Sequence, residues 1–245
     1  MKFENIKNID ISNPSTWEDK IFLTFDLDWC SNEVLLYTLD IIEKYDIKVT
    51  FFVTHKTPLL ERMRANNKIE LGIHPNFNFL LEGDFRYGKN IEEVIMYYKD
   101  IVPEAVSVRS HSMTQSSKIL DSFEKFGILY DCNTFIPFSS GIELKPYKYW
   151  TKKLTKVPYF WEDDVHFLYE WEWNVEKFIK YKGIKVFDFH PIHIFLNTEH
   201  LDRYVVSNRN SNEGINEGIL LSKFRYRGQG TYNFLLDLIR SVYEI

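Results

Sequence analysis

The sequence contains few cysteines and no long apolar run. Only Cys30 and Cys132 occur in its 245 residues, with no C-x-x-C pair, which argues against a disulfide framework or a cysteine-bound zinc. No stretch of about 18 consecutive apolar residues is present, so we expect no membrane insertion. Residues 1–17 lack the apolar segment of a secretory signal, and we therefore expect a cytoplasmic protein.

The chain also has little excess charge. It carries 30 Lys and Arg against 35 Asp and Glu, a net charge of -5, so we expect no nucleic acid and no anionic membrane surface as a partner. Its 44% hydrophobic and 17% aromatic content suffices for one large core, and residues 1–245 are expected to form a single domain. No pattern in the sequence specifies an oligomeric state.

Short β-branched or aromatic runs alternate with longer amphipathic segments, which indicates an α/β fold of repeated βα units around a parallel sheet. The predicted strands are 21–26, 48–54, 68–74, 105–110, 128–132, 154–160 and 184–189. Such a series either closes into an incomplete barrel or opens into a doubly wound sheet. Both arrangements place ligands at the carboxyl ends of the strands.

Helices are expected between these runs. Ser31 is a typical N-cap, Pro58 suits the first turn of a helix, and Gly127 is a typical residue after a helix end. The predicted helices begin after Ser31 and at Pro58, and further ones cover 91–101, 117–126, 175–181 and 232–243. A long polar segment, 197–230, precedes the last of them.

Acidic and basic side chains collect at the predicted carboxyl ends of the strands. They are Asp26, Asp28, His55, His74, Arg109, His111, Asp131, Asp163, Asp164, His166, His190 and His193. Of the seven histidines, only His200 lies elsewhere. One Asp or His at a strand end is usually a turn or cap residue. Together, imidazoles and carboxylates on one rim are the side chains of a metal-assisted acid–base site.

The stretch TFDLDW carries the most information. Asp26 and Asp28 have the same side-chain parity on an extended chain, so both can point to the same rim. Two carboxylates so close repel each other unless a cation or a shared proton relieves them. One can then bind a divalent metal while the other stays free as a general base. The alternative is a pair of turn-capping aspartates.

In order and spacing, several stretches resemble the motifs of the polysaccharide deacetylases, carbohydrate esterase family 4. They are TFDLDW, VTFFVTH, GIHPNFN, VRSHS, FWEDD and FDFHP. The resemblance implies a distorted, incomplete (β/α)7 barrel and a metal-dependent enzyme that removes acyl groups from sugars. We expect a motif-bearing core at about 20–197 and a closing segment with a helix at 198–245.

The resemblance also implies roles for single residues. Asp26 corresponds to the general base, Asp28 to a metal ligand, and His190 to the general acid that protonates the departing amine. His74 maps onto the family's first metal-binding histidine, and Asn78 maps onto the second.

Further roles follow from the remaining motifs. Arg109 matches the family's arginine and would orient a carboxylate or meet a substrate charge. Asp163 or Asp164 would hold His190 in its working tautomer. Candidates for substrate contact are Trp29, Phe77, Phe160, Trp161 and His193, although core packing is an alternative for the aromatic residues.

Two departures from the family pattern concern the metal. Asn78 offers a neutral amide oxygen where the family has an imidazole, and His111 places an imidazole where the family has proline. Asn78 ligates through its oxygen, or His111 replaces it, or the metal site is degraded. The expected cofactor is a divalent metal, Zn²⁺ first, with Co²⁺, Ni²⁺ or Mn²⁺ as alternatives.

We therefore expect a hydrolase that removes an acetyl or formyl group from an amino sugar. The expected partner is a small-molecule carbohydrate, such as a nucleotide-linked or other soluble precursor of O-antigen or capsule. The alternatives are a hydrolase of linear, non-sugar amides on the same scaffold, or a carbohydrate-binding relative that kept the barrel and lost catalysis.

Overall fold

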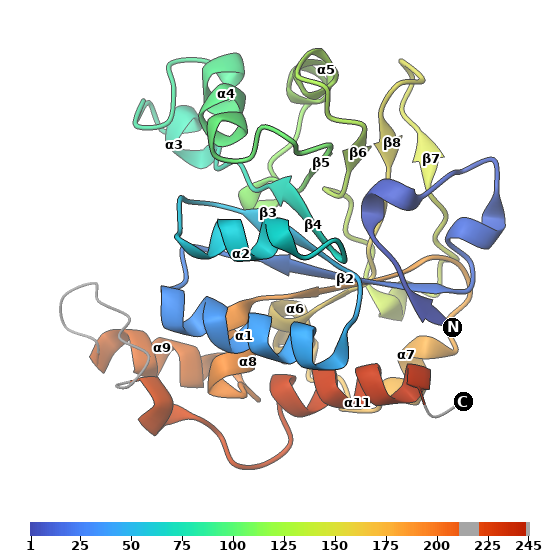
Figure 1. Ribbon diagram of the computed structural model, residues 1–245, viewed down its shortest axis with the longest axis vertical. Helices are drawn as coiled ribbons and strands as arrows, with labels where there is room; N and C mark the ends of the chain where they lie inside the picture. The colour runs from blue at the N-terminus through green and yellow to red at the C-terminus, as the bar shows by residue number, and fades with distance from the viewer. Residues whose placement is uncertain (211–220, 244–245) are drawn as a thin grey trace.

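A computed structural model describes residues 1–210 and 221–243, and its centre is a curled, mostly parallel sheet (Figure 1). All predicted strands are present. They are β2 (Lys20–Asp26), β3 (Val49–Val53), β4 (Ile69–Ile73), β5 (Ser107–Val108), β6 (Tyr130–Asp131), β8 (Thr155–Lys156) and β10 (Lys185–Phe189). Each pairs in parallel with the next up to β8, and β10 pairs with β2.

The barrel stays open between β8 and β10. Within the described chain, the sheet runs from β7 (Tyr147–Lys148), which pairs with β8, to β9 (Trp161–Glu162), which pairs with β10; β1 (Lys2–Phe3) pairs with β2. The strand expected at 154–160 forms only over Thr155–Lys156, since Pro158 offers no backbone N–H to a ladder, and β9 lies beyond the expected range. The predicted incomplete barrel is confirmed, and the doubly wound alternative is excluded.

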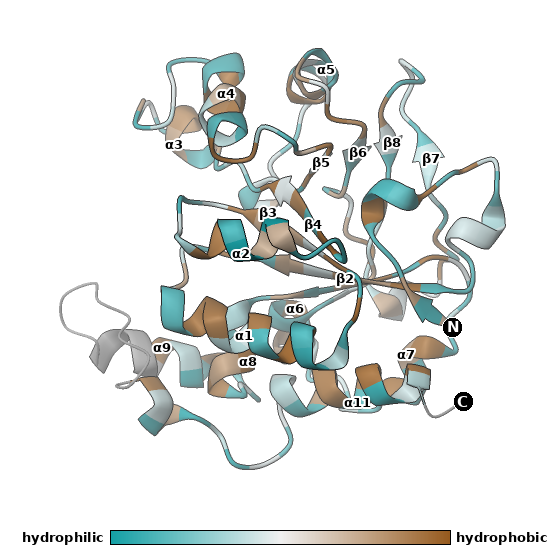
Figure 2. Ribbon diagram, in the orientation of Figure 1, coloured by the Kyte–Doolittle hydropathy of each residue, from teal (hydrophilic) through white to brown (hydrophobic). Residues whose placement is uncertain are grey.

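The predicted helices form at the expected places. They are α1 (Asn32–Tyr45), α2 (Leu59–Ala65), α4 (Ile91–Ile101), α5 (Ser117–Lys125), α7 (Val175–Ile179) and α11 (Thr231–Tyr243). The Ser31 hydroxyl accepts a hydrogen bond from the backbone N–H of Val34 and so caps α1. Gly127 follows α5 with a φ of 77°. Apolar and polar residues mix along α1, α4 and α11, as expected of helices with one buried face (Figure 2).

The sequence did not predict several short helices. They are α3 (Asn78–Leu81), α6 (Asp163–Tyr169), α8 (Pro191–Leu196), α9 (Leu201–Asn210) and the 3-10 turns Ile6–Asn8, Pro14–Thr16, His111–Met113, Phe138–Ser140 and Ser222–Phe224. Most are too short for an apolar repeat to show. The expected polar segment 197–230 therefore contains α9, and its residues 211–220 lie outside the described part of the chain.

Helices α1, α8 and α11 lie together on one side of the sheet (Figure 1). The strands between the helices are almost wholly buried: all residues of β3, β4 and β10 are, as expected for parallel strands covered on both faces. No described helix is both long enough and apolar enough to cross a membrane. Two of the short helices, α6 and α8, begin next to carboxyl ends of strands and bring acidic and imidazole side chains to the rim.

Candidate active site

A cavity of about 230 Å³ lies at the carboxyl ends of the strands. It is lined by Asp26, Asp28, His74, Arg109, Ser110, His111, Ser112, Met113, Tyr159, Glu162, Asp164 and His190. Seven of the predicted site residues are in this lining. Four others, Asn78, Trp29, Trp161 and His193, are not among the described residues that line it.

Asp28, His74 and His111 converge on one point. Nε2 of His74 lies 3.2 Å from Oδ1 of Asp28, and Nδ1 of His111 lies 3.3 Å from the same oxygen. The two imidazole nitrogens are 3.4 Å apart. In a tetrahedral zinc site with bonds of about 2.0–2.1 Å, neighbouring ligand atoms lie roughly 3.3–3.4 Å apart. The three atoms therefore have the spacing of one face of a zinc tetrahedron, and the donor types fit as well.

The charge state of Asp28 suits a cation. Burial raises the pKa of Asp28, but hydrogen bonds with His111 and His74 outweigh burial and hold this pKa well below its usual range. The other nitrogen of His74, Nδ1, is 3.5 Å from Oδ2 of Asp26. The predicted base and the predicted ligands are therefore direct neighbours.

Asn78 is held away from this point. Its amide oxygen accepts a hydrogen bond from the Thr114 hydroxyl at 2.9 Å, and its amide nitrogen donates to the Ser112 hydroxyl at 3.2 Å. Asn78 is the first residue of the short helix α3, and both ends of its amide are bonded to hydroxyls of the loop that follows His111. The structure therefore disagrees with Asn78 as a ligand and favours the alternative in which His111 takes its place.

The loops that carry Asp28 and His111 contain left-handed backbone. The φ angles are 37° at Asp28 and 54° at Trp29, and 54° and 52° at Ser112 and Met113, which directly follow His111. Residues other than glycine rarely adopt this conformation unless the surrounding structure holds them there. Both predicted ligands from these loops are thus set by backbone geometry that costs folding energy.

Trp29 supports this arrangement. Its backbone N–H donates to the Thr54 hydroxyl at 3.1 Å, and its ring lies edge-on to the His111 ring, with centroids 5.1 Å apart. The ring of Trp29 therefore contacts a candidate ligand. Trp29 is half-buried and is not among the described residues that line the cavity, and its contact with a sugar stays a prediction.

Arg109 is buried between two carboxylates. Its Nη1 donates to Oδ1 of Asp26 at 3.1 Å, to the Thr24 hydroxyl at 2.9 Å, and to Oδ1 of Asp188. Its guanidinium also lies over the Tyr159 ring, 4.3 Å from the centroid. Of the two predicted roles of Arg109, the orientation of a carboxylate agrees with these contacts, because the Nη1 group that meets Asp26 is already engaged.

Burial affects the pKa of Arg109 and that of its partner Asp188 in different ways. Burial alone lowers the pKa of Arg109, but the charges of Asp188 and Asp26 raise it well above its usual value, so the guanidinium stays a cation. Burial raises the pKa of Asp188 well above its usual range, against the opposing charge of Arg109. The sequence analysis gave Asp188 no role, although the pattern FDFH places it at the same strand parity as His190.

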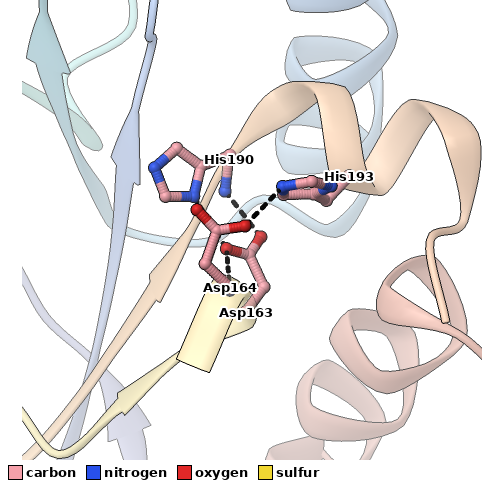
Figure 3. Close-up of side chains that lie close together, drawn as sticks. All are labelled: Asp163, Asp164, His190 and His193. Carbon is pink, nitrogen blue, oxygen red and sulfur yellow. Dashed lines mark hydrogen bonds and ion pairs between the residues drawn. The ribbon is translucent and has the colours of Figure 1, made fainter. Parts of the chain in front are cut away.

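His190 is held by Asp163. Nδ1 of His190 is 2.7 Å from Oδ1 of Asp163, and its backbone N–H donates to Oδ2 of Asp163 at 2.8 Å (Figure 3). Its Nε2 faces the cavity, 3.5 Å from Oδ2 of Asp28. Burial lowers the pKa of His190, but the charge of Asp163 raises it well above its usual value. Asp163 thus favours the imidazolium form of His190 and leaves its other nitrogen on the side of the cavity.

Asp164 does not share this contact. Its Oδ1 lies 2.8 Å from Nε2 of His193, in a second pair beside the first (Figure 3). Of the two candidates for the partner of His190, the structure brings Asp163 into contact with it and pairs Asp164 with His193. His193 is buried under this pair and is out of reach of a substrate in the cavity, so its predicted substrate contact is wrong as well.

Sequence reasoning missed a further pair. The Tyr159 hydroxyl donates to Oε2 of Glu162 at 3.1 Å, and both residues line the cavity. Burial raises the pKa of Glu162 to about 7, and the charge of His190 opposes this rise. Glu162 lies in the stretch FWEDD, which resembles a family motif, but only its acidic neighbours Asp163 and Asp164 were predicted to have roles.

The other predicted aromatic contacts are core contacts. The Trp161 ring is completely buried and stacks on Phe234, with centroids 4.7 Å apart. Phe77 and Phe160 are also fully buried. Because their rings have no accessible face, the prediction that Trp161 and these phenylalanines contact a sugar is wrong. His166 belongs to the same interior, since its ring stacks on Trp173 with centroids 3.9 Å apart.

Comparisons with known proteins were made with this geometry in hand. Residues 23–208 match the family described as WbmS-like polysaccharide deacetylases. The structure is similar to WbmS from Bordetella bronchiseptica, assigned as a polysaccharide deacetylase involved in O-antigen biosynthesis, with 43% identity, a TM-score of 0.90 and coverage of 98% of each chain.

More distant structures are similar too. A family 4 carbohydrate esterase from Streptomyces lividans gives a TM-score of 0.45 at 10% identity, covering 70% of this chain and 78% of its own. A polysaccharide deacetylase assigned in Mycobacterium smegmatis gives 0.47 at 18% identity, covering 70% and 77%. None of the curated proteins matches the chain.

Proposed function

The chain belongs to the WbmS-like polysaccharide deacetylases, and we propose that it is a metal-dependent hydrolase that removes an acetyl or formyl group from an amino sugar. The observation that carries this proposal is the set of three ligand atoms of Asp28, His74 and His111, within 3.4 Å of one another. The carboxylate of Asp26 and the imidazole of His190 lie on either side of this set.

Asp28, His74 and His111 would hold the metal, and Zn²⁺ is the ion that fits their spacing best. When bound, such an ion polarises an acyl carbonyl and makes water a better nucleophile. The charge of Asp28 and the fixed orientation of His74 between two aspartates prepare the donors before any ligand arrives.

Asp26 would act as the general base. Its Oδ1 is fixed by Arg109, which leaves Oδ2, the oxygen nearer the ligand set, to take the proton of the attacking water. Arg109 is therefore a positioning residue, since its guanidinium holds Asp26 and compensates the buried charge of Asp188. These two aspartates would otherwise repel each other.

His190 would act as the general acid. Its Nδ1 is bonded to Asp163, so the proton available for transfer is on Nε2, which faces the cavity. An amide nitrogen is a poor leaving group unless it is protonated, and Nε2 of His190 supplies that proton. Asp163 stabilises the imidazolium and fixes the ring.

The similarity to a protein assigned to O-antigen biosynthesis supports a substrate that is a precursor of a bacterial surface polysaccharide, O-antigen or capsule. We propose a nucleotide-linked or other soluble amino sugar. Because nucleotide sugars are made in the cytoplasm, the proposal also places the enzyme there. The similarity over 98% of each chain supports one catalytic domain for residues 1–245.

Two measurements test the proposal. Zinc content per chain should approach one in the unchanged protein and fall sharply in Asp28→Ala. Release of acetate or formate from nucleotide-linked N-acyl amino sugars should require the metal and should be lost in Asp28→Ala. If the protein binds no metal and shows no activity after addition of zinc, cobalt or nickel, the proposal that it is a metal-dependent hydrolase is refuted.

A His190→Ala variant tests the general acid separately. Its folded state and its zinc content should be retained, while turnover of an amide substrate falls by roughly a hundredfold or more. Near-normal turnover of an amide by this variant would rule out His190 as the acid. Hydrolysis of linear amides without hydrolysis of any amino sugar would favour the non-sugar alternative.

A further inference from the structure

Two adjacent aspartates at the start of α6 contact two different histidines. Asp163 is fully buried and holds His190, whereas Asp164 lines the cavity with 43% of its side chain exposed. His190 and His193 lie three residues apart, at the N-cap and in the first turn of α8, so they face the aspartates from the same side. Figure 3 shows the two pairs side by side.

In the second pair, the groups around His193 hold its ring in place. The His193 side chain is only 3% exposed, and its Nε2 lies 2.8 Å from Oδ1 of Asp164. Its Nδ1 is 3.1 Å from the Thr198 hydroxyl. The ring is packed edge-on against Phe167 and Tyr204, with centroids 5.1 and 5.3 Å away. His193 therefore has one orientation, and it fixes the carboxylate of Asp164 at the cavity wall.

Only one oxygen of the fixed Asp164 carboxylate, Oδ1, contacts His193. Within residues 1–210 and 221–243, the hydrogen bonds and ion pairs of Asp164 beyond those of its helix are made by the backbone N–H and by Oδ1, and Oδ2 makes none. Burial raises the pKa of Asp164, but the charge of His193 and its hydrogen bond outweigh burial and lower it. An ionised carboxylate accepts hydrogen bonds and donates none, and it repels anions.

Several neighbouring polar groups of the cavity are already engaged. Nη1 of Arg109 is bonded to two aspartates, and Tyr159 is bonded to Glu162. Nη2 of Arg109 and the Ser110 hydroxyl are buried donors, whereas the carboxylate of Asp164 is an acceptor. Asp26, His190 and the three candidate ligands have roles in the reaction proposed above. Asp164 lies in the same cavity wall as His190, the proposed acid for the departing nitrogen, so a sugar bound with its amide nitrogen at His190 would bring its neighbouring ring atoms near Asp164.

We infer that Asp164, held by His193, accepts a hydrogen bond from a hydroxyl group of the amino sugar next to the scissile amide. This inference rests on the proposed function and adds the group that distinguishes a sugar amide from a plain amide. It also implies a substrate class: the sugar carries a hydroxyl at this position, and a carboxylate or phosphate there would be repelled.

The test compares two amides in the zinc-supplied enzyme. Methyl 2-acetamido-2-deoxyglucoside, with its galacto epimer, carries ring hydroxyls, and 4-nitroacetanilide carries none. In Asp164→Asn, kcat/KM for the sugar amides should fall about tenfold or more relative to kcat/KM for the anilide, because a hydrogen bond to a charged group is lost. The loss should lie in KM rather than in kcat.

Asp163→Asn is the matched control, since it changes the neighbouring aspartate in the same way. It should lower kcat for sugar and anilide alike, because His190 loses its charged partner. For His193, a positioning residue, His193→Ala should reproduce the KM effect of Asp164→Asn, and His193→Gln, which keeps a donor, should restore part of it. Thermal unfolding identifies any variant that has lost its fold.

A binding measurement does not depend on turnover. In a His190→Ala background, NMR titration of the two glycosides should show a dissociation constant about tenfold higher when Asp164→Asn is added. Absence of hydrolysis by the unchanged enzyme would count against the proposed function, while this titration still decides the role of Asp164.

Several results would overturn the inference. Equal losses of kcat/KM for sugar and anilide would make Asp164 part of the chemistry itself. Unchanged sugar binding, or no sugar binding by the parent variant, would remove its role in recognition. Loss of zinc from Asp164→Asn would make it a ligand, in the group of Asp163, Asp164, His190 and His193 whose donor atoms lie within 4.8 Å of one another.

Discussion

Replacing His111 with alanine tests which side chain completes the metal site. His111 contributes Nδ1 at 3.3 Å from Asp28 and 3.4 Å from His74, and these separations match ligands that share one ion. Asn78 instead bonds to Thr114 and to another hydroxyl of the same loop. The two substitutions should therefore have very different effects on zinc affinity.

The magnitude follows from the number of ligands. Zinc binding by a complete four-ligand protein site is worth roughly 10–16 kcal/mol, so one ligand corresponds to roughly 2.5–4 kcal/mol. His111→Ala should thus weaken zinc binding roughly 100- to 1,000-fold. Asn78→Ala removes two exposed or half-exposed hydrogen bonds away from the ligand atoms. It should change zinc affinity less than about threefold and stability by less than about 1 kcal/mol.

The assay is a competition titration against a chromophoric chelator, with zinc per chain measured after dialysis. Thr114→Val serves as a control, because it removes a hydrogen bond of Asn78 without touching a ligand. If Asn78→Ala loses zinc while His111→Ala keeps it, the loop must rearrange around the ion, and the ligand set derived from the distances is refuted.

Three further predictions concern stability. Arg109→Met leaves Asp26 and Asp188 buried without their cation, so the free energy of unfolding in urea should fall by about 3–5 kcal/mol; an unchanged value would mean the two carboxyls are protonated. Burial lowers the pKa of His166 from 6.5 to about 4, so between these values the unfolded chain binds a proton that the folded chain does not, and the free energy of unfolding falls as the pH is lowered from 6.5 to 4. The loss, up to about 3 kcal/mol, should vanish in His166→Gln, and a persistent acid slope there would contradict it. Gly72→Ala places a methyl group 2.7 Å from a phenylalanine ring and a serine hydroxyl, so melting followed by circular dichroism should show a loss of about 1–3 kcal/mol, and an unchanged melt would argue against this packing.

The central strands of the sheet could be predicted because each of them has a recognisable sequence pattern. β2, β3, β4 and β10 are short runs rich in apolar and β-branched residues and almost wholly buried, a pattern that a sequence displays directly. The strand predicted at 154–160 forms only over Thr155–Lys156, because Pro158 follows it, and β9 at Trp161–Glu162 was not predicted. The short helices α6 and α8 have too few turns to show a period.

The sequence predicted which types of residue reach the cavity, but it predicted less well which of these side chains contact one another. The spacing of TFDLDW and the strand-end position of His74 brought both to the rim, as the structure has them. The choice between Asp163 and Asp164, or between Asn78 and His111, depends on side-chain direction in a loop or a first helical turn. Adjacent residues there point to different places, and neither composition nor spacing records the direction.

The left-handed backbone beside the ligand set has a consequence for engineering and for evolution. Asp28, Trp29, Ser112 and Met113 each hold a conformation that costs about 1–3 kcal/mol for a residue other than glycine. Glycine at Ser112 or Met113 is therefore the simplest route to a more heat-resistant protein, and a screen for thermostability alone would select it. The same change would make the loop that carries His111 more flexible. Selection for thermostability should therefore favour glycine at these positions, and selection for metal affinity should disfavour it.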